Sequence, residues 1–498
     1  MKLSRLSLSD IHAGDPDIPD EHIFSLPERI IQFGTGVLLR GLPDYFVDQA
    51  NKKGIFNGRV LVVKSTQSGD SDSFDKQDGL YSISVRGMES GKAVDQSIIS
   101  SAISRVLNAN DQWPEILRCA SNPEMQIVIS NTTEVGIQYV AESISQSPPV
   151  SFPGKLLAFL YERYKQFNGS ADAGMVIVPT ELITENGNKL KLILLELAGF
   201  NVLEKPFINW LSLHNQFCNS LVDRIVPGKP NPELKKEIEQ KLGYTDDLMI
   251  VCEPYRLWAI EGDKTVRDRL SFSSVDQGMI ITEDITKYKE LKLRMLNGTH
   301  TVCCGLAYLS GFPTVKAAME DKQFEKFVKE VMLHEIGAAI PFDIPENEIR
   351  EFGFNVIDRF KNPFLEHNWL SITMQYTSKM TVRVVPVLKK YDELHKKPPA
   401  FISLGLAAYI LFMRPVKKDG NKYYGVYNNK EYLISDDKAG YFYDLWQNNP
   451  IEHIVRTLFS NEVLWQANLD HLTGLSENVS EKLNILHTKG VRSVLSEA

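Results

Sequence analysis

The segment 29–64 constrains the fold of this chain more than any other stretch. Arg29–Phe33 is a short apolar run that predicts a buried strand, and it leads directly into the glycine turn Gly34–Gly36. An amphipathic helix is expected from about Val37 to Lys52, followed by a second apolar strand, Arg59–Lys64. Because strand, helix and strand in this order form a right-handed parallel unit, the segment predicts an α/β fold with a parallel sheet.

The glycine turn is suited to a pyrophosphate, since glycines let phosphate groups approach the backbone at the start of a helix. The pattern is incomplete, because Leu39 stands where a third glycine is expected, and an ordinary tight turn is the alternative. The second strand ends at Lys64 rather than at the acidic residue that binds an adenosine ribose. Lys64 would favour a 2′-phosphate, so these residues leave both NAD and NADP open.

Polar residues follow three further strand-like runs. Asn131 comes after Met125–Ser130, Glu181 after Met175–Val178, and Glu253 directly after a run that ends at Cys252. Since ligands bind at the carboxyl ends of strands in open α/β sheets, Asn131 is a candidate for cofactor or substrate, and the two glutamates for substrate. Capping a turn is the alternative for Asn131 and for Glu253. The sequence around Gly87 and Gly91 predicts a hairpin, with strands in 78–85 and 92–94.

The pattern changes near residue 281 from alternating strands and helices to long helical runs. We therefore expect two domains, an α/β dinucleotide-binding domain over residues 1–281 and a mostly α-helical domain over 282–498 that carries substrate binding and catalysis. Helices are predicted in the second domain near 284–309, 323–333, 346–359, 369–378 and 399–413.

The first of these helices contains Lys292, Asn297 and His300. At about 100° per residue they fall at roughly 0°, 140° and 80° on a helical wheel, and therefore share one face. An ammonium, an amide and an imidazole on one face can move a proton on and off a hydroxyl group. Solvated or structurally satisfied side chains are the alternative. Lys379 and Arg383 supply cations for an acidic substrate, or belong to a solvated charged face.

Composition narrows the class of partner. A net charge of −8 and a pI near 5.8 disfavour a nucleic-acid or anionic-membrane surface and favour small molecules. The five cysteines include no CxxC or Cys/His ligand spacing, so neither a disulfide framework nor a zinc site is indicated. The N-terminal residues lack an apolar signal region, and we expect a cytoplasmic protein without a membrane anchor.

Several motifs together resemble the mannitol dehydrogenase family of long-chain polyol dehydrogenases, and within it the tagaturonate reductase subgroup. The resemblance runs from about Arg29 to beyond Arg383. The motifs are Ile30-Ile31-Gln32-Phe33-Gly34-Thr35-Gly36 with Leu39-Arg40, Gln77-Asp78-Gly79-Leu80-Tyr81, Ser130-Asn131-Thr132-Thr133-Glu134, Pro179-Thr180-Glu181-Leu182-Ile183 with Asn186-Gly187, and Lys292-x4-Asn297-x2-His300.

The resemblance implies a Rossmann-like N-terminal domain, a mostly helical C-terminal domain, an active site between them and no metal. It implies that Lys292 is the general acid/base, Asn297 an oxyanion donor, and His300 a substrate-orienting group. NAD is the implied cofactor, with NADP as a minority option. The implied cofactor-binding residues are Phe33, Gly34, Thr35, Gly36, Leu39, Arg40, Lys64 and Asn131, and the implied substrate-binding residues are Glu181, Glu253, Lys379 and Arg383.

Two departures bear on the substrate. Glu181 stands where polyol dehydrogenases have an asparagine, and Ser371 where they have an arginine. Both argue against mannitol and match the subgroup that interconverts D-tagaturonate and D-altronate in hexuronate catabolism, which is the expected activity. A fructuronate/mannonate or mannitol-type oxidoreductase is the alternative, and a non-catalytic dinucleotide-binding protein is disfavoured by the intact Lys-Asn-His triplet. We expect a sugar-acid substrate and a monomer or weak homo-oligomer.

Overall fold

The structure, a computed structural model, describes residues 1–11, 17–65, 72–132 and 136–495. Contacts divide the chain into two compact units. Unit 1 comprises Met1–Arg86 and Ala93–Ile285, and unit 2 comprises Gly87–Lys92 and Thr286–Ala498. The boundary expected from the sequence, at 281/282, precedes this division by a few residues.

Unit 1 is built on a six-stranded sheet with the order β5-β2-β1-β6-β7-β8, in which the paired strands run parallel. This order places β1 at the centre, with one half of the sheet on each side, as in the Rossmann fold. The predicted α/β Rossmann-like class is therefore confirmed. The strands are β1 (Glu28–Phe33), β2 (Arg59–Lys64), β5 (Ile103–Asn108), β6 (Ile127–Ser130), β7 (Val176–Pro179) and β8 (Gln216–Phe217).

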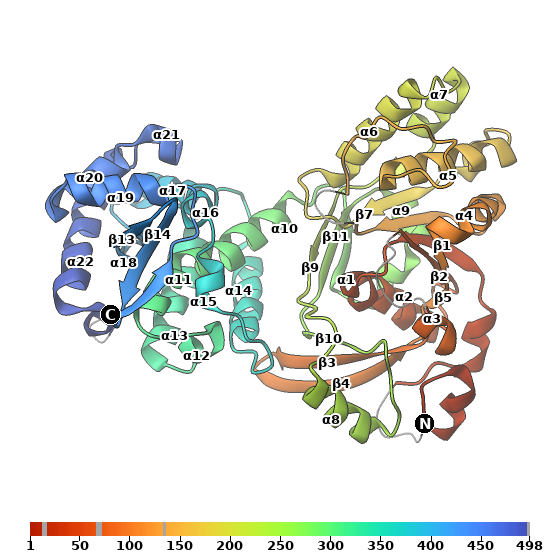
Figure 1. Cartoon of the computed structure of the whole chain (residues 1–498), viewed down its shortest axis with the longest axis horizontal. Coiled ribbons are helices and arrows are strands. Elements are labelled where there is room, and N and C mark those ends of the chain that lie inside the picture. The colour runs from red at the N-terminus through yellow and green to blue at the C-terminus, as the bar shows by residue number, and fades with distance from the viewer. Residues whose placement is uncertain (12–16, 66–71, 133–135, 496–498) are drawn as a thin grey trace. The chain divides into compact units, whose positions relative to one another are not determined.

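Helices cover both faces of this sheet, which explains why its central strands are largely apolar runs (Figure 1). One face packs in a core with α2 (Pro43–Lys52), and the other with α4 (Ala109–Arg118), α5 (Phe152–Gln166), α6 (Asn186–Phe200) and α7 (Lys205–Leu213). Alternate residues serve the two cores, so that Ile30 belongs to the first and Ile31 to the second.

The helix predicted over Val37–Lys52 is interrupted. It forms α1 (Val37–Gly41) and α2 (Pro43–Lys52), because Leu42 leaves the helical conformation at φ −134° and ψ −73°. Pro43 explains the break, since a proline lacks the N–H group that would continue the hydrogen bonding and disfavours helical geometry in the residue before it.

Two smaller sheets lie in unit 1, except for the hairpin residues Gly87–Lys92, which belong to unit 2. The predicted hairpin is confirmed as β3 (Tyr81–Glu89) and β4 (Lys92–Ser100), and β10 (Ile250–Cys252) pairs with β3 in parallel. The other sheet has the order β12-β11-β9, formed by Met279–Thr282, Leu257–Glu261 and Ser220–Asp223. A short helix, α8 (Pro232–Leu242), precedes β10.

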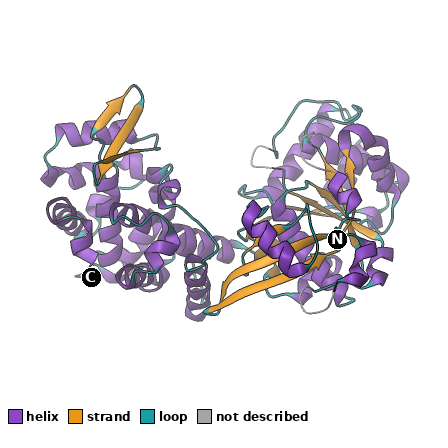
Figure 2. Cartoon of the chain, turned by 60° about the horizontal axis from the view of Figure 1, so that its bottom comes forward, coloured by secondary structure: helices purple, strands orange, loops and turns teal. Residues whose placement is uncertain are grey.

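Unit 2 is mostly helical, as predicted (Figure 2). Its first helical run consists of α10 (Thr286–Leu291), the π-helix Lys292–Gly298 and α11 (Thr299–Leu309). The helices predicted at 323–333, 346–359 and 399–413 correspond to α13 (Lys322–Lys329) with the π-helix Glu330–Ile336, α14 (Glu346–Phe360) and α18 (Ala400–Phe412). Later helices include α17 (Val385–His395), α20 (Ile451–Phe459) and α22 (Leu475–Lys489).

Two features of unit 2 differ from the sequence-based expectation. The single helix predicted over 369–378 is wrong, because Gln375 has φ +51° and separates α15 (Trp369–Ile372) from α16 (Tyr376–Arg383). A small antiparallel sheet of β13 (Lys417–Asp419), β14 (Lys422–Tyr427) and β15 (Lys430–Leu433) was not predicted.

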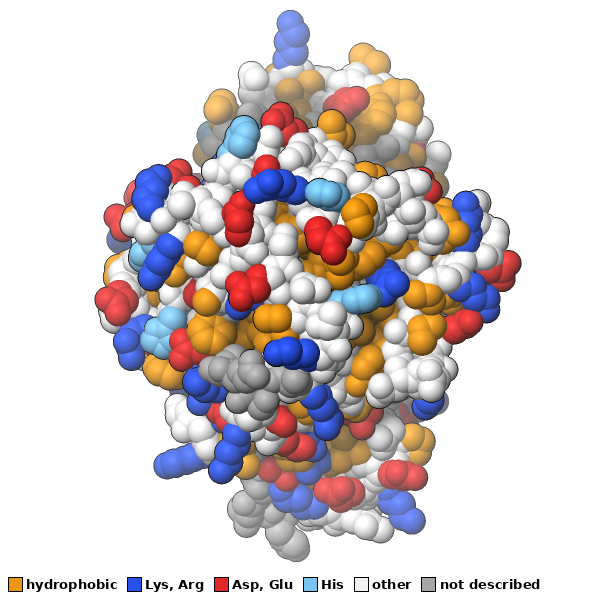
Figure 3. Space-filling model, turned by 90° about the vertical axis from the view of Figure 1, so that its left-hand side faces the viewer, with side chains coloured by type: hydrophobic (Ala, Val, Ile, Leu, Met, Phe, Trp, Pro, Cys, Tyr) orange, Lys and Arg blue, Asp and Glu red, His pale blue; other side chains and the backbone are white. Residues whose placement is uncertain are grey.

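The face of the molecule drawn in Figure 3 has no large patch of only acidic or only basic side chains. Acidic and basic side chains are interspersed there with apolar ones. Among the described helices, none has both the length and the apolar composition that crossing a bilayer requires.

Candidate functional site

The turn Gly34–Gly36 follows β1 at the centre of the sheet, and its two glycines have different roles. Gly34 has φ +125°, and a Cβ atom there would lie 2.9 Å from the Asn131 carbonyl oxygen and 3.0 Å from Leu39 Cδ1. Only glycine fits this position without strain. Gly36 has φ −61°, and a Cβ atom there would meet no atom within 4 Å. The backbone at Gly36 therefore faces open space.

That space belongs to a cavity of about 420 Å³ at the carboxyl ends of the sheet strands. Four of the predicted cofactor-binding residues line it together, namely Gly34, Thr35, Gly36 and Asn131. The other described lining residues are Ser65, Thr132, Gly136, Gln138, Val140, Val150, Ser151, Phe152 and Lys155. Thr133 and Glu134, which belong to the motif Ser130-Asn131-Thr132-Thr133-Glu134, lie outside the described residues.

Four other predicted cofactor residues have their side chains inside unit 1 rather than along this cavity. The Phe33 ring packs on Phe152, with 5.2 Å between centroids, and Leu39 is fully buried in the core. Arg40 Nη1 donates to the Leu248 carbonyl oxygen at 2.5 Å, and burial lowers the pKa of this guanidinium. Lys64 is only 4% exposed.

Glu181 and Asn131 join the ends of β6 and β7. The Glu181 carboxylate accepts hydrogen bonds from Thr132 N and Thr132 Oγ1, both at 2.9 Å, and from Ser130 Oγ at 3.1 Å. Burial raises the pKa of Glu181. Asn131 Nδ2 donates to Thr180 Oγ1 at 2.9 Å. Glu181 therefore holds the loop that lines the cavity, although it is not itself a lining residue.

Glu253 is also anchored within unit 1. It is 1% exposed, and its Oε1 atom accepts a hydrogen bond from Ile225 N at 2.7 Å. Its backbone carbonyl accepts another from Arg224 Nε at 2.9 Å. These contacts connect the residue after β10 to the segment after β9, and none of the three residues lines the cavity.

In unit 2, the Lys-Asn-His triplet spans the junction of a π-helix and an α-helix. Lys292 and Asn297 are half-buried and lie five residues apart within the π-helix Lys292–Gly298. Because a π-helix closes i→i+5 hydrogen bonds and takes more residues per turn than an α-helix, residues five apart lie nearer to one another around its axis than they would in an α-helix. The winding therefore brings these two side chains closer in direction than the α-helical wheel predicted.

His300, at the start of α11, is surrounded by rings. It stacks on Phe360 with a centroid distance of 4.2 Å and meets His367 edge-on at 5.1 Å. Its Nδ1 atom is buried and has no hydrogen-bond partner among the described residues. Burial, reinforced by positive neighbours, holds the pKa of His300 well below its ordinary value. This imidazole is neutral at physiological pH.

The positive neighbours form a group that we call the cationic cluster, consisting of Arg359, Lys379 and Arg383. All three lower the pKa of His300. Arg383 Nη1 donates to Thr301 Oγ1 at 3.1 Å, and Lys379 Nζ donates to the Ile372 carbonyl oxygen at 3.0 Å. The pKa of Lys379 is lowered by burial first and by Arg383 second. Adding an anion would relieve this mutual repulsion.

The structure adds site residues that sequence reasoning did not select. His367 contacts His300, and Thr132 and Lys155 line the cavity of unit 1. Among the described residues, no group of three His, Cys, Asp or Glu side chains is arranged to hold a metal, and the five cysteines are free thiols.

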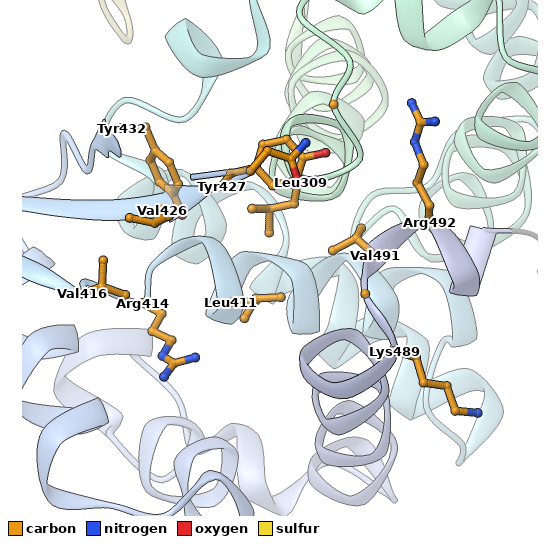
Figure 4. A pocket seen from close by; sticks show the side chains of 13 residues that line it. Leu309, Leu411, Arg414, Val416, Val426, Tyr427, Tyr432, Lys489, Val491 and Arg492 are labelled. Carbon is orange, nitrogen blue, oxygen red and sulfur yellow. The ribbon is translucent and has the colours of Figure 1, made fainter. Parts of the chain in front are cut away.

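A second cavity, of about 660 Å³, lies in unit 2 (Figure 4). Its wall combines apolar side chains such as Leu309, Leu411 and Val491 with the cations Arg414, Lys489 and Arg492. In the close-up, Lys489 and Arg492 extend away from the apolar side chains, and Arg492 Nε donates to the Ser310 carbonyl oxygen at 2.9 Å. No residue expected from the sequence to act at the site is among those that line it.

Comparison with known proteins assigns the family. The mannitol dehydrogenase Rossmann domain matches residues 28–274, and the mannitol dehydrogenase C-terminal domain matches residues 284–486. The chain belongs to the mannitol dehydrogenase family. It is therefore an oxidoreductase that acts on CH–OH groups, as expected from its motifs.

Two named relatives resemble this chain over nearly its whole length. An altronate oxidoreductase of Halalkalibacterium halodurans is 37% identical over 481 residues, which is 95% of this chain and 93% of that protein. An altronate oxidoreductase of Shigella flexneri is 36% identical over 478 residues, covering 94% and 96%.

Two solved structures share the fold of this chain. A D-sorbitol dehydrogenase in substrate-free form gives a TM-score of 0.78 at 20% identity, covering 99% of this chain and 100% of that chain. The mannitol 2-dehydrogenase of Pseudomonas fluorescens, in a ternary complex with NAD and D-mannitol, gives 0.69 at 21% identity, covering 100% and 99%.

Proposed function

We propose that this chain is an NAD-dependent, metal-independent oxidoreductase that reduces D-tagaturonate to D-altronate in hexuronate catabolism. The observation that supports this substrate best is the similarity to altronate oxidoreductases, at 36–37% identity over 94–95% of the chain. The cationic cluster beside His300 supports it independently, because a sugar acid carries a carboxylate and a polyol does not.

In this proposal, the half-buried Lys292 is the general acid/base. A bound nicotinamide cofactor would supply the hydride, and Lys292 would protonate the alkoxide that results from reduction of the ketone. Asn297 donates a hydrogen bond to the same oxygen, which stabilises its developing charge. The hydrogen bonds that Asn297 accepts from Thr301 Oγ1 and Arg383 Nη1 go to its backbone carbonyl, which leaves its side-chain amide available for this role.

His300 acts as a neutral orienting group. Its lowered pKa keeps the imidazole uncharged, and its stacking on Phe360 fixes the plane of the ring. A neutral imidazole can donate one hydrogen bond and accept another, which suits the hydroxyl groups of a sugar acid. The cationic cluster then binds the carboxylate, with Arg383 and Lys379 as the residues that favour sugar acids over polyols.

The cavity of unit 1 is the proposed dinucleotide site. Its turn presents backbone at Gly36 to open space, which suits the close approach of a pyrophosphate. NAD is the proposed cofactor, because Lys64, the residue that would favour NADP, is 4% exposed and is not among the described residues that line the cavity.

A substrate panel tests the proposal. D-altronate, D-mannonate and D-mannitol are oxidised with NAD and with NADP, and formation of the reduced nicotinamide is followed by absorbance. We expect D-altronate with NAD to give the highest kcat/KM. A tenfold preference for D-mannonate or D-mannitol, about 1.4 kcal/mol of transition-state free energy, would replace the proposal with one of the alternative activities.

A further inference from the structure

The helix α5 begins with a buried lysine that the proposed chemistry has not used. Ser151 caps the helix by accepting a hydrogen bond from Gly154 N at 3.0 Å, and Lys155 follows in the first turn. The next residues, including Leu156 and Leu160, are fully buried in the core. Lys155 itself is 4% exposed. Burying an ammonium group costs free energy, so a lysine in this position requires a compensating interaction.

Among the described residues, the Lys155 ammonium has one direct hydrogen-bond partner. Its Nζ atom donates to the Val150 carbonyl oxygen at 2.7 Å. The carboxylate of Glu142 favours the charged form of Lys155. Its oxygens accept hydrogen bonds from Val150 N, Ser151 N and Ser151 Oγ. Burial lowers the pKa of Lys155, and Glu142 only partly opposes this effect. An ammonium has three N–H donors, and the Val150 carbonyl occupies one of them.

Lys155 also lines the cavity of unit 1, together with the turn Gly34–Gly36. Among the described residues of that lining, it is the only charged side chain. A pyrophosphate carries a negative charge on each of its phosphate groups. Among the described lining residues, the Lys155 ammonium is the group that can compensate that charge. The glycine turn offers the same ligand close approach to the backbone.

We propose that Lys155 binds the pyrophosphate of the dinucleotide, on the wall of the cavity that it shares with the Gly34–Gly36 turn. This inference rests on the proposed dinucleotide-binding function. The proposal places the cation that compensates the charge of the pyrophosphate on α5. This helix is not part of the strand-turn-helix segment in which the sequence pattern predicts phosphate binding.

The test measures binding rather than turnover. Dissociation constants for NADH and for ADP-ribose are determined by fluorescence and calorimetry for the wild type, Lys155→Met and Lys155→Arg. Lys165→Met is the matched control, because Lys165 lies on the same helix, is exposed and pairs with Glu162 at 2.6 Å. We expect Lys155→Met to weaken both ligands about tenfold or more, Lys155→Arg to retain most of the affinity, and Lys165→Met to bind as the wild type does.

Adenosine, which has no phosphate, separates a charge contact from a loosened cavity. We expect Lys155→Met to bind adenosine as the wild type does. Equal weakening of adenosine and ADP-ribose, or unchanged affinity for ADP-ribose, would overturn the assignment of Lys155. If the wild type binds neither NADH nor ADP-ribose, the proposed function itself fails.

If Lys155→Met does not fold, a second experiment compares the wild type with Lys155→Arg. Wild-type affinity for ADP-ribose should weaken as the pH rises through the lowered pKa of Lys155, because the ammonium loses its charge. Lys155→Arg should keep its affinity over the same range, since a guanidinium stays protonated. Coincident pH profiles for the two proteins would contradict the proposal.

Discussion

At the scale of single residues, Lys292 carries the proposed proton transfer. Lys292→Met keeps the length and helix propensity of the side chain but removes its titratable group. We expect kcat to fall by roughly 10²-fold or more, the usual scale of acid/base catalysis, while NADH binding is retained. Steady-state kinetics and fluorescence titration measure the two effects.

The pH profile distinguishes a proton carrier from a group that only shapes the site. In the oxidation direction, the wild-type rate should rise with pH as the general base loses its proton, and this ionisation should be missing from the residual activity of Lys292→Met. Asn297→Ala is the matched control: it should lose roughly 3 kcal/mol of transition-state stabilisation and keep the ionisation. A folded Lys292→Met protein with the wild-type pH profile would assign the proton to another group.

The two glycines of the turn lead to a second prediction at the residue scale. Gly36→Val places its side chain in open space, so we expect the variant to fold normally and to bind NADH at least tenfold more weakly because the side chain fills the cofactor site. Gly34→Ala should instead lower the melting temperature, since Gly34 has φ +125° and a Cβ atom would crowd Asn131. Normal NADH affinity in folded Gly36→Val would remove the turn from the cofactor site.

At the scale of elements, Glu335 connects the π-helix Glu330–Ile336 to the start of α18. Its carboxyl oxygens accept hydrogen bonds from Phe401 N at 2.9 Å and Ile402 N at 2.6 Å. Burial nevertheless raises the pKa of Glu335 to about 7. A folded pKa above the unfolded one means that this group's contribution is fully present below the unfolded pKa and is lost as the pH rises to about 7.

Glu335→Gln removes this titration and keeps a side-chain oxygen that can accept from the helix. Between about pH 4.5 and pH 7, the free energy of unfolding of the wild type should therefore decrease by about 1–3 kcal/mol more than that of Glu335→Gln. Urea unfolding at several pH values, followed on the transition of unit 2, measures the difference. Parallel pH dependence in both proteins would show that Glu335 does not titrate in this range.

The elements also show what the sequence could predict. β1, β2, β6 and β7 were recognised because strands covered on both faces are continuous apolar runs. β5 was missed because Ser104 and Arg105 interrupt its apolar pattern. The π-helix at Lys292 and the break at Gln375 depend on packing within unit 2, which local periodicity does not encode.

The residues of the candidate site also divide into those that the sequence could predict and those that it could not. The turn and Asn131 follow strands, so their position at one cavity was predictable from the rule that strand ends meet. Lys155 and His367 come from elements whose roles become visible only when the chain is folded. A lysine in the first turn of an apolar helix, as in the stretch from Ser151 to Leu160, is the signal that could have identified Lys155.

At the scale of the whole molecule, the chain divides its proposed tasks between two units. Unit 1 contains the glycine turn and the cavity for a dinucleotide, whereas unit 2 contains the Lys-Asn-His triplet and the cationic cluster. Both domain patterns of the mannitol dehydrogenase family match, one in each unit, so the chain carries both halves of an oxidoreductase.

The most direct test of the central claim identifies the product. The protein is incubated with NADH and D-tagaturonate, NADH consumption is followed by absorbance, and the sugar acid formed is resolved by chromatography against both epimeric alcohols. We predict that D-altronate forms as the single product, one molecule for each NADH consumed, without added metal. Formation of the epimer, or no NADH consumption with D-tagaturonate while D-fructuronate or D-fructose is reduced, would contradict the account.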